Sequence, residues 1–288
     1  MATVAARYWT WTGLLVIALT VASAALAQTA QRYGDELYRP NLRQPGKDVM
    51  WLPTPDGMVT RMLHAAKVTS GDLVVDLGAG EGRIPIAAAK EFGATAIGIE
   101  YDPALAALAR RNATRAGVGD KVTIIAGDMF KQDFSKATVV TMYLLPDLNF
   151  QLRPRLLAMK PGTRVVSHMW DMGEWEADET FDLDDSEGFM WIVPARVAGK
   201  WSLRDDRGHW QAEVTITQQF QRIGGTMHLY GKTQPILGAF ISGSTMGFTF
   251  VDIHGGVRSL RAHVDGATLA GQLRYAGNLT PLTGARLP

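Results

Sequence analysis

The stretch from Val74 to Gly82 constrains the fold more than any other part of the chain. It reads Val-Val-Asp-Leu-Gly-Ala-Gly-Glu-Gly, so a short apolar run passes into three closely spaced glycines. Apolar residues continue at helical spacing after Gly82, from Ile84 to Ala88. A strand that enters a helix through a glycine turn begins a βαβ unit, and open α/β sheets bind ligands at such turns. The stretch therefore predicts a parallel α/β sheet with a ligand site at its carboxyl edge.

The same alternation continues through the first part of the chain. Helical patterns separate five strand-like runs, at residues 73–77, 95–100, 121–126, 138–145 and 163–169. Strands joined by helices of about 10–15 residues indicate right-handed βαβ crossovers. We therefore expect an α/β fold, a doubly wound Rossmann-like sheet, over residues 51–195.

The pattern changes after Trp170. Nine acidic residues and no basic one lie between Asp171 and Glu187, which is usually a solvated loop, although such a run can attract a basic protein. Beyond about residue 191, only strand-like runs separated by turns occur. The first one or two can complete the α/β sheet as antiparallel edge strands. The others predict a small antiparallel β module over residues 196–288.

The N-terminal segment is typical of an export signal. Arg7 is the only charged side chain before an apolar run from Leu14 to Ala27, which ends in small residues. We expect residues 1–27 to be a signal peptide cleaved before Gln28, which would place the mature chain in the periplasm. The alternative is an uncleaved anchor, and membrane contact is expected only through this segment. Residues 28–50 then form a linker or covering arm.

Bulk composition excludes several classes of function. The 29 basic and 28 acidic residues give a net charge of +1, whereas proteins that bind nucleic acid usually carry a basic excess. No nucleic-acid partner is therefore expected. The chain has no cysteine, which excludes disulfides, thiolate metal sites and a cysteine nucleophile. Its histidines show no metal-ligand spacing, so no metal is expected either.

The glycine turn favours S-adenosylmethionine (SAM) over a dinucleotide. Its spacing is G-x-G-x-G, whereas the dinucleotide fingerprint is G-x-G-x-x-G and prepares a helix N-terminus for a pyrophosphate. SAM has no phosphate, but its methionyl end is cationic and suits a nearby carboxylate. The predicted cofactor-binding residues at the turn are Asp76, Gly78, Ala79 and Gly80.

Two later acids reinforce this prediction. Glu100 ends the second strand, where it can accept hydrogen bonds from both ribose hydroxyls. Asp128 follows the third strand, where it can accept from the adenine amino group, and Tyr101 and Met129 can supply apolar walls for the base. One such acid alone is more often a solvated loop residue or a helix cap. Three acids at successive strand ends predict one site.

Residues of about 51–170 resemble the class I SAM-dependent methyltransferases. More narrowly, they resemble the small lysine N-methyltransferases of mitochondrial membrane proteins and their bacterial relatives. The resemblance implies that the chain is an enzyme with SAM as cofactor, a protein lysine as acceptor, and SAM contacts from the glycine turn, Glu100 and Asp128. It does not extend to the acidic stretch or the β module. The segments that carry it are Trp51-Leu52-Pro53-Thr54-Pro55, Asp76–Arg83, Gly98-Ile99-Glu100-Tyr101 and Tyr143–Asn149.

The segment after the fourth strand predicts the acceptor site, because many amine methyltransferases hold the accepting nitrogen there. Methyl transfer is an in-line displacement at a sulfonium, so the protein mainly aligns the partners and excludes water. Asp147 or Asn149 can orient the amine by accepting a hydrogen bond from it. The alternative role of Asp147 is to cap the following helix. His168 and Asp171 are weaker candidates for the cleft.

The sequence therefore predicts a SAM-dependent N-methyltransferase of a protein lysine. Two alternatives stay open at this point. One is a methyltransferase with a small-molecule or lipid acceptor, and the other is an exported SAM-fold binding module without turnover.

Overall fold

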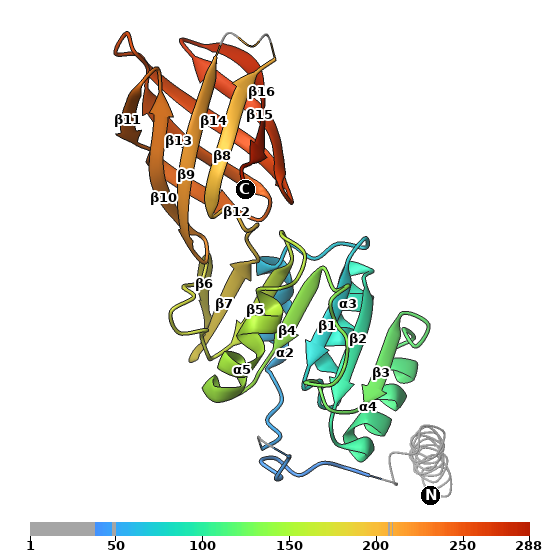
Figure 1. Ribbon diagram of the computed structural model, residues 1–288. Coiled ribbons are helices and arrows are strands. Elements are labelled where there is room, and N and C mark those ends of the chain that lie inside the picture. Colours follow the sequence, from blue (N-terminus) through green and yellow to red (C-terminus); the bar gives the residue numbers. More distant parts are fainter. Residues whose placement is uncertain (1–37, 48–49, 207, 209) are drawn as a thin grey trace, which may run out of the picture.

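The computed structural model describes residues 38–47, 50–206, 208 and 210–288 (Figure 1). The predicted signal peptide and its cleavage site lie outside the described residues. The chain forms a seven-stranded mixed sheet followed by a nine-stranded antiparallel sheet, and the two sheets share no strand. The first sheet ends with β7 at Ile192 and the second begins with β8 at Gly199. No helix among the described residues is long and apolar enough to cross a membrane.

The seven-stranded sheet has the order β3-β2-β1-β4-β5-β7-β6. Strands β1 to β5 are parallel, and β7 pairs with β5 in the antiparallel sense. This order, which runs outward from β1 in both directions, confirms the predicted doubly wound Rossmann-like class. The bounds are β1 Leu73–Leu77, β2 Thr95–Glu100, β3 Val122–Ala126, β4 Val139–Met142, β5 Arg164–His168, β6 Glu179–Leu183 and β7 Ser186–Ile192.

Helices cover both faces of this sheet. The bounds are α2 Asp56–Ala65, α3 Arg83–Phe92, α4 Pro103–Arg115 and α5 Pro146–Leu156. Helices α2, α3 and α4 form one core with the sheet, in which alanines such as Ala88 and Ala109 allow close packing. Helix α5 packs on the other face, where Leu152 is buried together with Trp175 and Trp191.

The parallel register brings the three predicted acids to one edge. Asp76 lies opposite Gly98 on β2 and Thr141 on β4. Glu100 is the last residue of β2 and pairs with Ala126, two residues before Asp128. Because the carboxyl ends of parallel strands meet at one edge, the three carboxylates lie around a single place.

Residues 171–187 are more ordered than the predicted solvated loop. Met172, Trp175 and Phe181 are buried within this stretch, and β6 pairs with β7 as a hairpin at the edge of the sheet. The acidic side chains occupy the outward positions between these anchors. The loop prediction was wrong because it weighed the charges and overlooked the buried apolar residues among them. Antiparallel strands do complete the α/β sheet, but they are β6 and β7, which lie almost wholly before the runs beyond residue 191 that were predicted for this role.

The second sheet is an up-and-down meander that curls until its edges meet. Its order is β11-β10-β9-β8-β16-β15-β14-β13-β12, so the edge strands β11 and β12 are neighbours in sequence. The Gln234 side chain links the edge strand β11 to β13, which lies next to the other edge strand, because its amide bonds the backbone N–H and C=O of Val251 at 3.0 and 2.7 Å. Trp201, Phe248 and Phe250 help to fill the interior.

The bounds are β8 Gly199–Asp205, β9 Gln211–Gln219, β10 Arg222–Leu229, β11 Lys232–Pro235, β12 Leu237–Ser242, β13 Thr245–Val251, β14 Val257–Asp265, β15 Thr268–Tyr275 and β16 Asn278–Arg286. The antiparallel β module was predicted, but its strands β8, β11, β15 and β16 were not. Pro281 and Gly284 in β16 weaken the pattern by which a strand is recognised.

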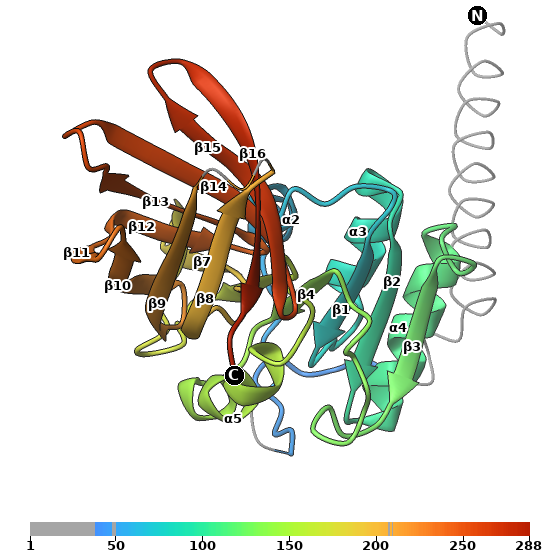
Figure 2. The ribbon, with the colours of Figure 1, turned by 45° about the horizontal axis from the view of Figure 1, so that its top comes forward.

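The β module joins the first sheet beside its β6–β7 edge (Figures 1 and 2). Phe220, in the turn between β9 and β10, stacks on Trp175 with ring centroids 6.3 Å apart. Gln221 donates to the backbone oxygen of Glu176 at 2.6 Å, and the Glu176 side chain forms an ion pair with Arg222. We call this end of the module its proximal end and the opposite end, which lies at the top of Figure 1, its distal end.

Candidate active site

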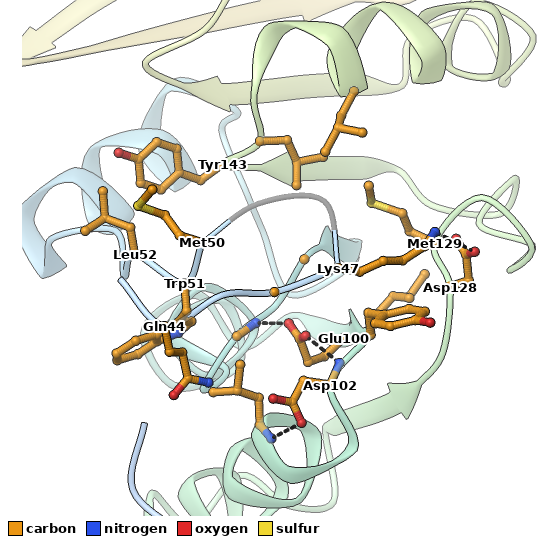
Figure 3. A pocket seen from close by; sticks show the side chains of 18 of the residues that line it. Gln44, Lys47, Met50, Trp51, Leu52, Glu100, Asp102, Asp128, Met129 and Tyr143 are labelled. Carbon is orange, nitrogen blue, oxygen red and sulfur yellow. Dashed lines mark hydrogen bonds and ion pairs between the residues drawn. The ribbon is translucent and has the colours of Figure 1, made fainter. Parts of the chain in front are cut away.

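Two adjoining cavities lie at the carboxyl edge of the seven-stranded sheet, and Figure 3 shows the larger one. The larger one reaches past Glu100 to Asp128, and the smaller one extends over the glycine turn to Asp76. The residues that line both are Trp51, Leu52, Gly78, Gly80 and Tyr143. These shared residues mark the junction between the cavities.

The glycine turn has the backbone that its spacing predicts. Gly78 and Gly80 have φ angles of 82° and 55°, in the left-handed region that favours glycine. The N–H groups of Gly78 and Ala79 both donate to the carbonyl of Ile99, at 2.9 and 3.0 Å. A Cβ on Gly80 would lie 2.9 Å from the indole nitrogen of Trp51. A side chain at this position would therefore push Trp51 away from the site.

Asp76 lies at the floor of the smaller cavity and is buried. Thr141 donates its hydroxyl to the Asp76 carboxylate at 2.8 Å. Burial raises the pKa of Asp76 to about 7 against the hydrogen bond from Thr141, with a smaller upward contribution from the negative charge of Glu100. A cationic ligand group in this cavity would stabilise the ionised carboxylate.

The Glu100 carboxylate is fixed by backbone groups at the cavity wall. The N–H groups of Gly80 and Asp102 donate to its two oxygens at 2.7 and 2.8 Å. Burial raises the pKa of Glu100, and these hydrogen bonds oppose that shift. Each carboxylate oxygen can accept a further hydrogen bond. Glu100 therefore presents an oriented acceptor to the larger cavity.

Asp128 pairs with a cation from the N-terminal arm, residues 38–47 and 50–52. Lys47 lies 3.1 Å from one carboxylate oxygen, and the N–H of Phe130 donates to the other at 3.0 Å. The Phe130 amide and Lys47 together lower the pKa of Asp128. The Lys47 nitrogen is also 5.1 Å from the centre of the Tyr101 ring. These contacts fasten the arm across the larger cavity.

The parts of the arm before and after Lys47 bond to each other through their backbones. The N–H of Arg43 donates to the carbonyl of Trp51 at 3.0 Å, and the N–H of Trp51 donates to the carbonyl of Gln44 at 2.9 Å. Met50 and Leu52 from the arm lie beside Tyr143 (Figure 3).

The sequence predicted a covering arm but did not identify Lys47, Met50 or Trp51 as site residues. Trp51 belongs to a segment that carries the family resemblance, and that was its only signal. Lys47 and Asp128 are 81 residues apart, so no local pattern could pair them.

All predicted cofactor residues line one cavity or the other. The set is Asp76, Gly78, Ala79, Gly80, Glu100, Tyr101, Asp128 and Met129. The two predicted acceptor residues, Asp147 and Asn149, line neither of them. Asp147 is exposed in the first turn of α5, whose N-cap is Leu145 without a side-chain hydrogen bond. The alternative role of Asp147 as the helix cap is therefore wrong.

Asn149 is buried and holds the turn that follows β5. Its amide nitrogen lies 3.3 Å from the Ser167 hydroxyl and 3.1 and 3.2 Å from the carbonyls of Trp170 and Asp171. Met169, inside this turn, has a φ of 68°, which is unusual for a residue with a side chain. The Asn149 side-chain oxygen has no partner among the described residues. In this structure Asn149 positions the backbone beside the site.

His168, a weaker candidate, packs behind the site. Its ring is buried, and neither ring nitrogen has a hydrogen-bond partner among the described residues. Burial lowers the pKa of His168 to about 4, so the ring is neutral at pH 7. It lies 4.0 Å from the ring of Tyr143, centroid to centroid. His168 thus supports Tyr143, the side chain at the junction of the cavities.

The described residues contain no group of three or more histidine, aspartate or glutamate side chains that could hold a metal ion.

Comparison with known proteins identifies relatives of the seven-stranded domain. Residues 76–179 match the family model described as the ANTKMT methyltransferase domain. A protein-lysine N-methyltransferase of Saccharolobus islandicus is 44% identical over 139 residues, which cover 48% of this chain and 86% of that protein. The adenine nucleotide translocase lysine N-methyltransferase of Mus musculus is 36% identical over 104 residues. That match covers 36% of this chain and 45% of the mouse protein, somewhat less than half of its length.

A solved structure is also similar. It is described as an RNA methyltransferase from Salinibacter ruber in complex with S-adenosyl-L-homocysteine. It is 50% identical, has a TM-score of 0.50, and the match covers 51% of this chain and 96% of that one. The glycine turn and the two cavities agree with these relatives. The chain therefore belongs to the SAM-dependent methyltransferase family that the ANTKMT methyltransferase domain defines.

Proposed function

We propose that this methyltransferase transfers the methyl group of SAM to a lysine amine of a protein. The observation that carries the acceptor class is the composition of the rim around the two cavities. Its exposed large apolar side chains are Met50, Leu52 and Tyr101. The two cations that line the cavities, Lys47 and Arg83, are each paired with carboxylates of this chain. An RNA acceptor would need cationic side chains that contact its phosphates. An apolar rim beside the acidic residues 171–187 favours a polypeptide that presents a positively charged side chain.

The proposed position of SAM follows from the shape and charge of the cavities. The larger cavity takes the adenosine, with the base between Tyr101 and Met129 and the ribose hydroxyls on Glu100. The smaller cavity takes the amino-acid end, whose ammonium offsets the buried charge of Asp76 and whose carboxylate faces Arg83. The glycine at position 80 fits this arrangement, because a Cβ there would fill the space that Trp51 occupies.

The junction of the cavities is the place for methyl transfer. The sulfonium of SAM lies between its adenosine and its amino-acid end, so it would lie near Tyr143, which lines both cavities. SAM, when bound, supplies an electrophilic methyl group. Tyr143, held from behind by His168, lines the path of the incoming amine. The arm residues Trp51 and Leu52 close the junction and exclude water.

The lysine must lose a proton before it attacks, because its lone pair forms the new N–C bond as the C–S bond breaks. An apolar path lowers the pKa of an amine and so favours the neutral form. Asp147, exposed in the first turn of α5, is proposed to receive the positively charged side chain at the rim. Asn149 is proposed to act by fixing the turn from Ser167 to Asp171.

The acceptor class is tested by incubating the purified protein with methyl-labelled SAM and an extract of its host. We expect the label in protein, and in methyllysine after acid hydrolysis. An Asp76→Asn variant provides the matched control, because it keeps the hydrogen bond from Thr141 but removes the carboxylate charge. Label in RNA, in lipid or in small molecules would overturn the lysine proposal.

We also propose that the chain is exported and that its mature form begins at Gln28. The support is the sequence alone, with its apolar run ending in Ala25-Leu26-Ala27. N-terminal sequencing of the protein from its host's periplasmic fraction tests this. An intact Met1 in the membrane fraction would favour an anchor in place of a cleaved signal.

A further inference from the structure

The β module carries exposed apolar side chains gathered toward its distal end. We call them the distal patch: Tyr230, Leu237, Val251, Ile253, Val257 and Leu279. They are substantially exposed, Ile253 at 55% and Val257 at 67%. Among the other exposed large apolar residues of the described chain, Leu42, Met50, Leu52 and Tyr101 belong to the arm or line the larger cavity, and the module's Phe240 and Tyr275 each lie beside an arginine side chain.

Strand pairing brings the members of the distal patch together. Val251 on β13 pairs with Val257 on β14, across the turn that carries Ile253. The row formed by Leu237, Thr249, Ser259, Arg274 and Leu279 crosses β12 to β16, because each residue pairs with the next. The patch residues of β12, β13, β14 and β16 therefore lie at one end of the module, with the polar residues Thr249, Ser259 and Arg274 between Leu237 and Leu279, and Tyr230 lies in the turn between β10 and β11.

Other parts of the module show that this exposure is local. Phe220 is an apolar residue in a turn at the proximal end, but Trp175 stacks on it and the Arg153 guanidinium lies 5.7 Å from its ring. The outward residues of β9 are polar, among them Glu213, Thr215 and Thr217. Apolar turns are thus covered where the first sheet packs on them, and they are uncovered at the distal end.

The charge around the distal patch is basic. From Leu237 to Leu282 the sequence has two acidic residues and three arginines. Asp252 is buried and bonded to Arg258 at 2.9 Å, and Asp265 lies in the turn at the opposite end of β14. The exposed arginines are Arg261, whose guanidinium is 5.9 Å from the ring of Phe240, and Arg274.

We propose that the distal patch docks on a membrane surface that contains anionic lipids. Apolar side chains on neighbouring turns can insert into the boundary between headgroups and acyl chains, and arginines beside them attract anionic headgroups. Five cavities of the described chain lie in or beside the first sheet, and the distal patch lines none of these five. Separate exposed side chains, two in turns (Tyr230 and Ile253) and the others near strand ends, suit a deformable lipid surface better than a rigid protein partner, which would need matching pockets.

This docking would turn the catalytic edge away from the membrane. The arm and the carboxyl ends of β1 and β4 lie at the end of the molecule opposite the distal patch (Figure 1). The proposal does not depend on the acceptor of the methyl group, and its test uses no methyl transfer.

The absence of cysteine allows a site-specific test in the full chain. An Ile253→Cys variant carries an environment-sensitive fluorophore at the distal patch, and a Thr217→Cys variant carries it on the polar strand β9. Vesicles of phosphatidylcholine with phosphatidylglycerol are expected to shift the emission at position 253 to the blue, and lipid-borne quenchers to reduce it. Position 217 is expected not to respond, even where the N-terminal segment holds the protein on the vesicle.

The fluorophore is itself apolar and can partition into vesicles without help from the patch, so a second pair of variants changes the patch or the control strand β9 and leaves the label in place. Val257→Asp in the labelled Ile253→Cys chain is expected to weaken the vesicle-dependent shift roughly tenfold, whereas Thr215→Asp leaves it unchanged. Equal responses at positions 253 and 217, no response at either, or equal responses to vesicles without phosphatidylglycerol would each overturn the proposal. A shift at position 253 that grows with protein concentration in the absence of vesicles would overturn it in favour of a second copy of the chain.

Discussion

Asp76 links ligand binding to pH. Its pKa of about 7 exceeds the ordinary value of about 3.9, so the folded chain binds this proton more tightly than the unfolded chain does. The resulting stability is fully present below about pH 4 and is lost as the pH rises toward 7. A bound ammonium favours the ionised carboxylate and reverses this loss. We therefore expect SAM affinity to rise by up to about tenfold per pH unit between about pH 5.5 and 7.

Calorimetric titrations over this pH range measure that slope. The Asp76→Asn variant should bind SAM more weakly with a nearly flat profile. Its thermal stability without ligand should also vary less with pH than that of the unchanged chain. If the SAM affinity of the variant rose with pH as steeply as that of the unchanged chain, the group that loses its proton on SAM binding would not be Asp76.

Asn149 acts through the three acceptors that its amide nitrogen holds. An Asn149→Ala substitution leaves the carbonyls of Trp170 and Asp171 without this donor in a buried place. We expect a loss of about 2–4 kcal/mol in the free energy of unfolding, measured by denaturant titration. A loss below about 0.5 kcal/mol would show that this turn holds its shape without Asn149.

Asp147 provides the contrasting case at the surface. Because it is exposed and caps no helix, Asp147→Ala should change the free energy of unfolding by less than about 0.5 kcal/mol. SAM affinity should also stay nearly unchanged, while turnover on the protein acceptor falls roughly 10²-fold. Single-turnover kinetics with the acceptor check this. Normal turnover would remove Asp147 from the acceptor site.

Among the elements, the N-terminal arm depends on Gly80. A Gly80→Ala substitution places a Cβ 2.9 Å from the Trp51 indole, whereas a Cβ on Gly117 would meet nothing within 4 Å. Both glycines have positive φ, so either change should cost about 1 kcal/mol of stability through backbone strain. Only Gly80→Ala should displace the arm and weaken SAM binding. Equal SAM affinities in the two variants, measured by calorimetry, would separate the arm from the site.

Elements with strong local patterns could be predicted from the sequence. The glycine turn and the acids at the ends of β1, β2 and β3 identified one edge of the sheet, since parallel pairing brings strand ends together whatever the details of packing. The hairpin of β6 and β7 was missed because its many charges concealed Phe181, its buried anchor. The contact between Lys47 and Asp128 could not be predicted either, because only the folded chain brings these two residues together.

At the scale of the whole molecule, one relative lacks a counterpart to about half of this chain. The match to the Saccharolobus islandicus protein covers 48% of this chain and 86% of that one, so a related domain exists without an equivalent of the β module. We expect a chain that ends after Ala198 to keep SAM binding. It should melt at a lower temperature, because it exposes Trp175 and the partners of Phe220 and Arg222. Unchanged melting in a scanning calorimeter would show that the module contributes no stability.

Because β8 and β16 lie side by side, a chain of this kind can arise by fusion of two separate units. The first and last strands of the meander pair with each other, and the N–H of Leu287 donates to the carbonyl of Lys200 at 2.8 Å. The module therefore starts and finishes at one spot, next to the connection that leaves β7. A unit with this geometry works as a cassette: genetic fusion behind β7, the last strand of the first sheet in the sequence, adds it to an enzyme without threading it through the catalytic domain. Its surface could be exchanged for another while the methyltransferase keeps its own core.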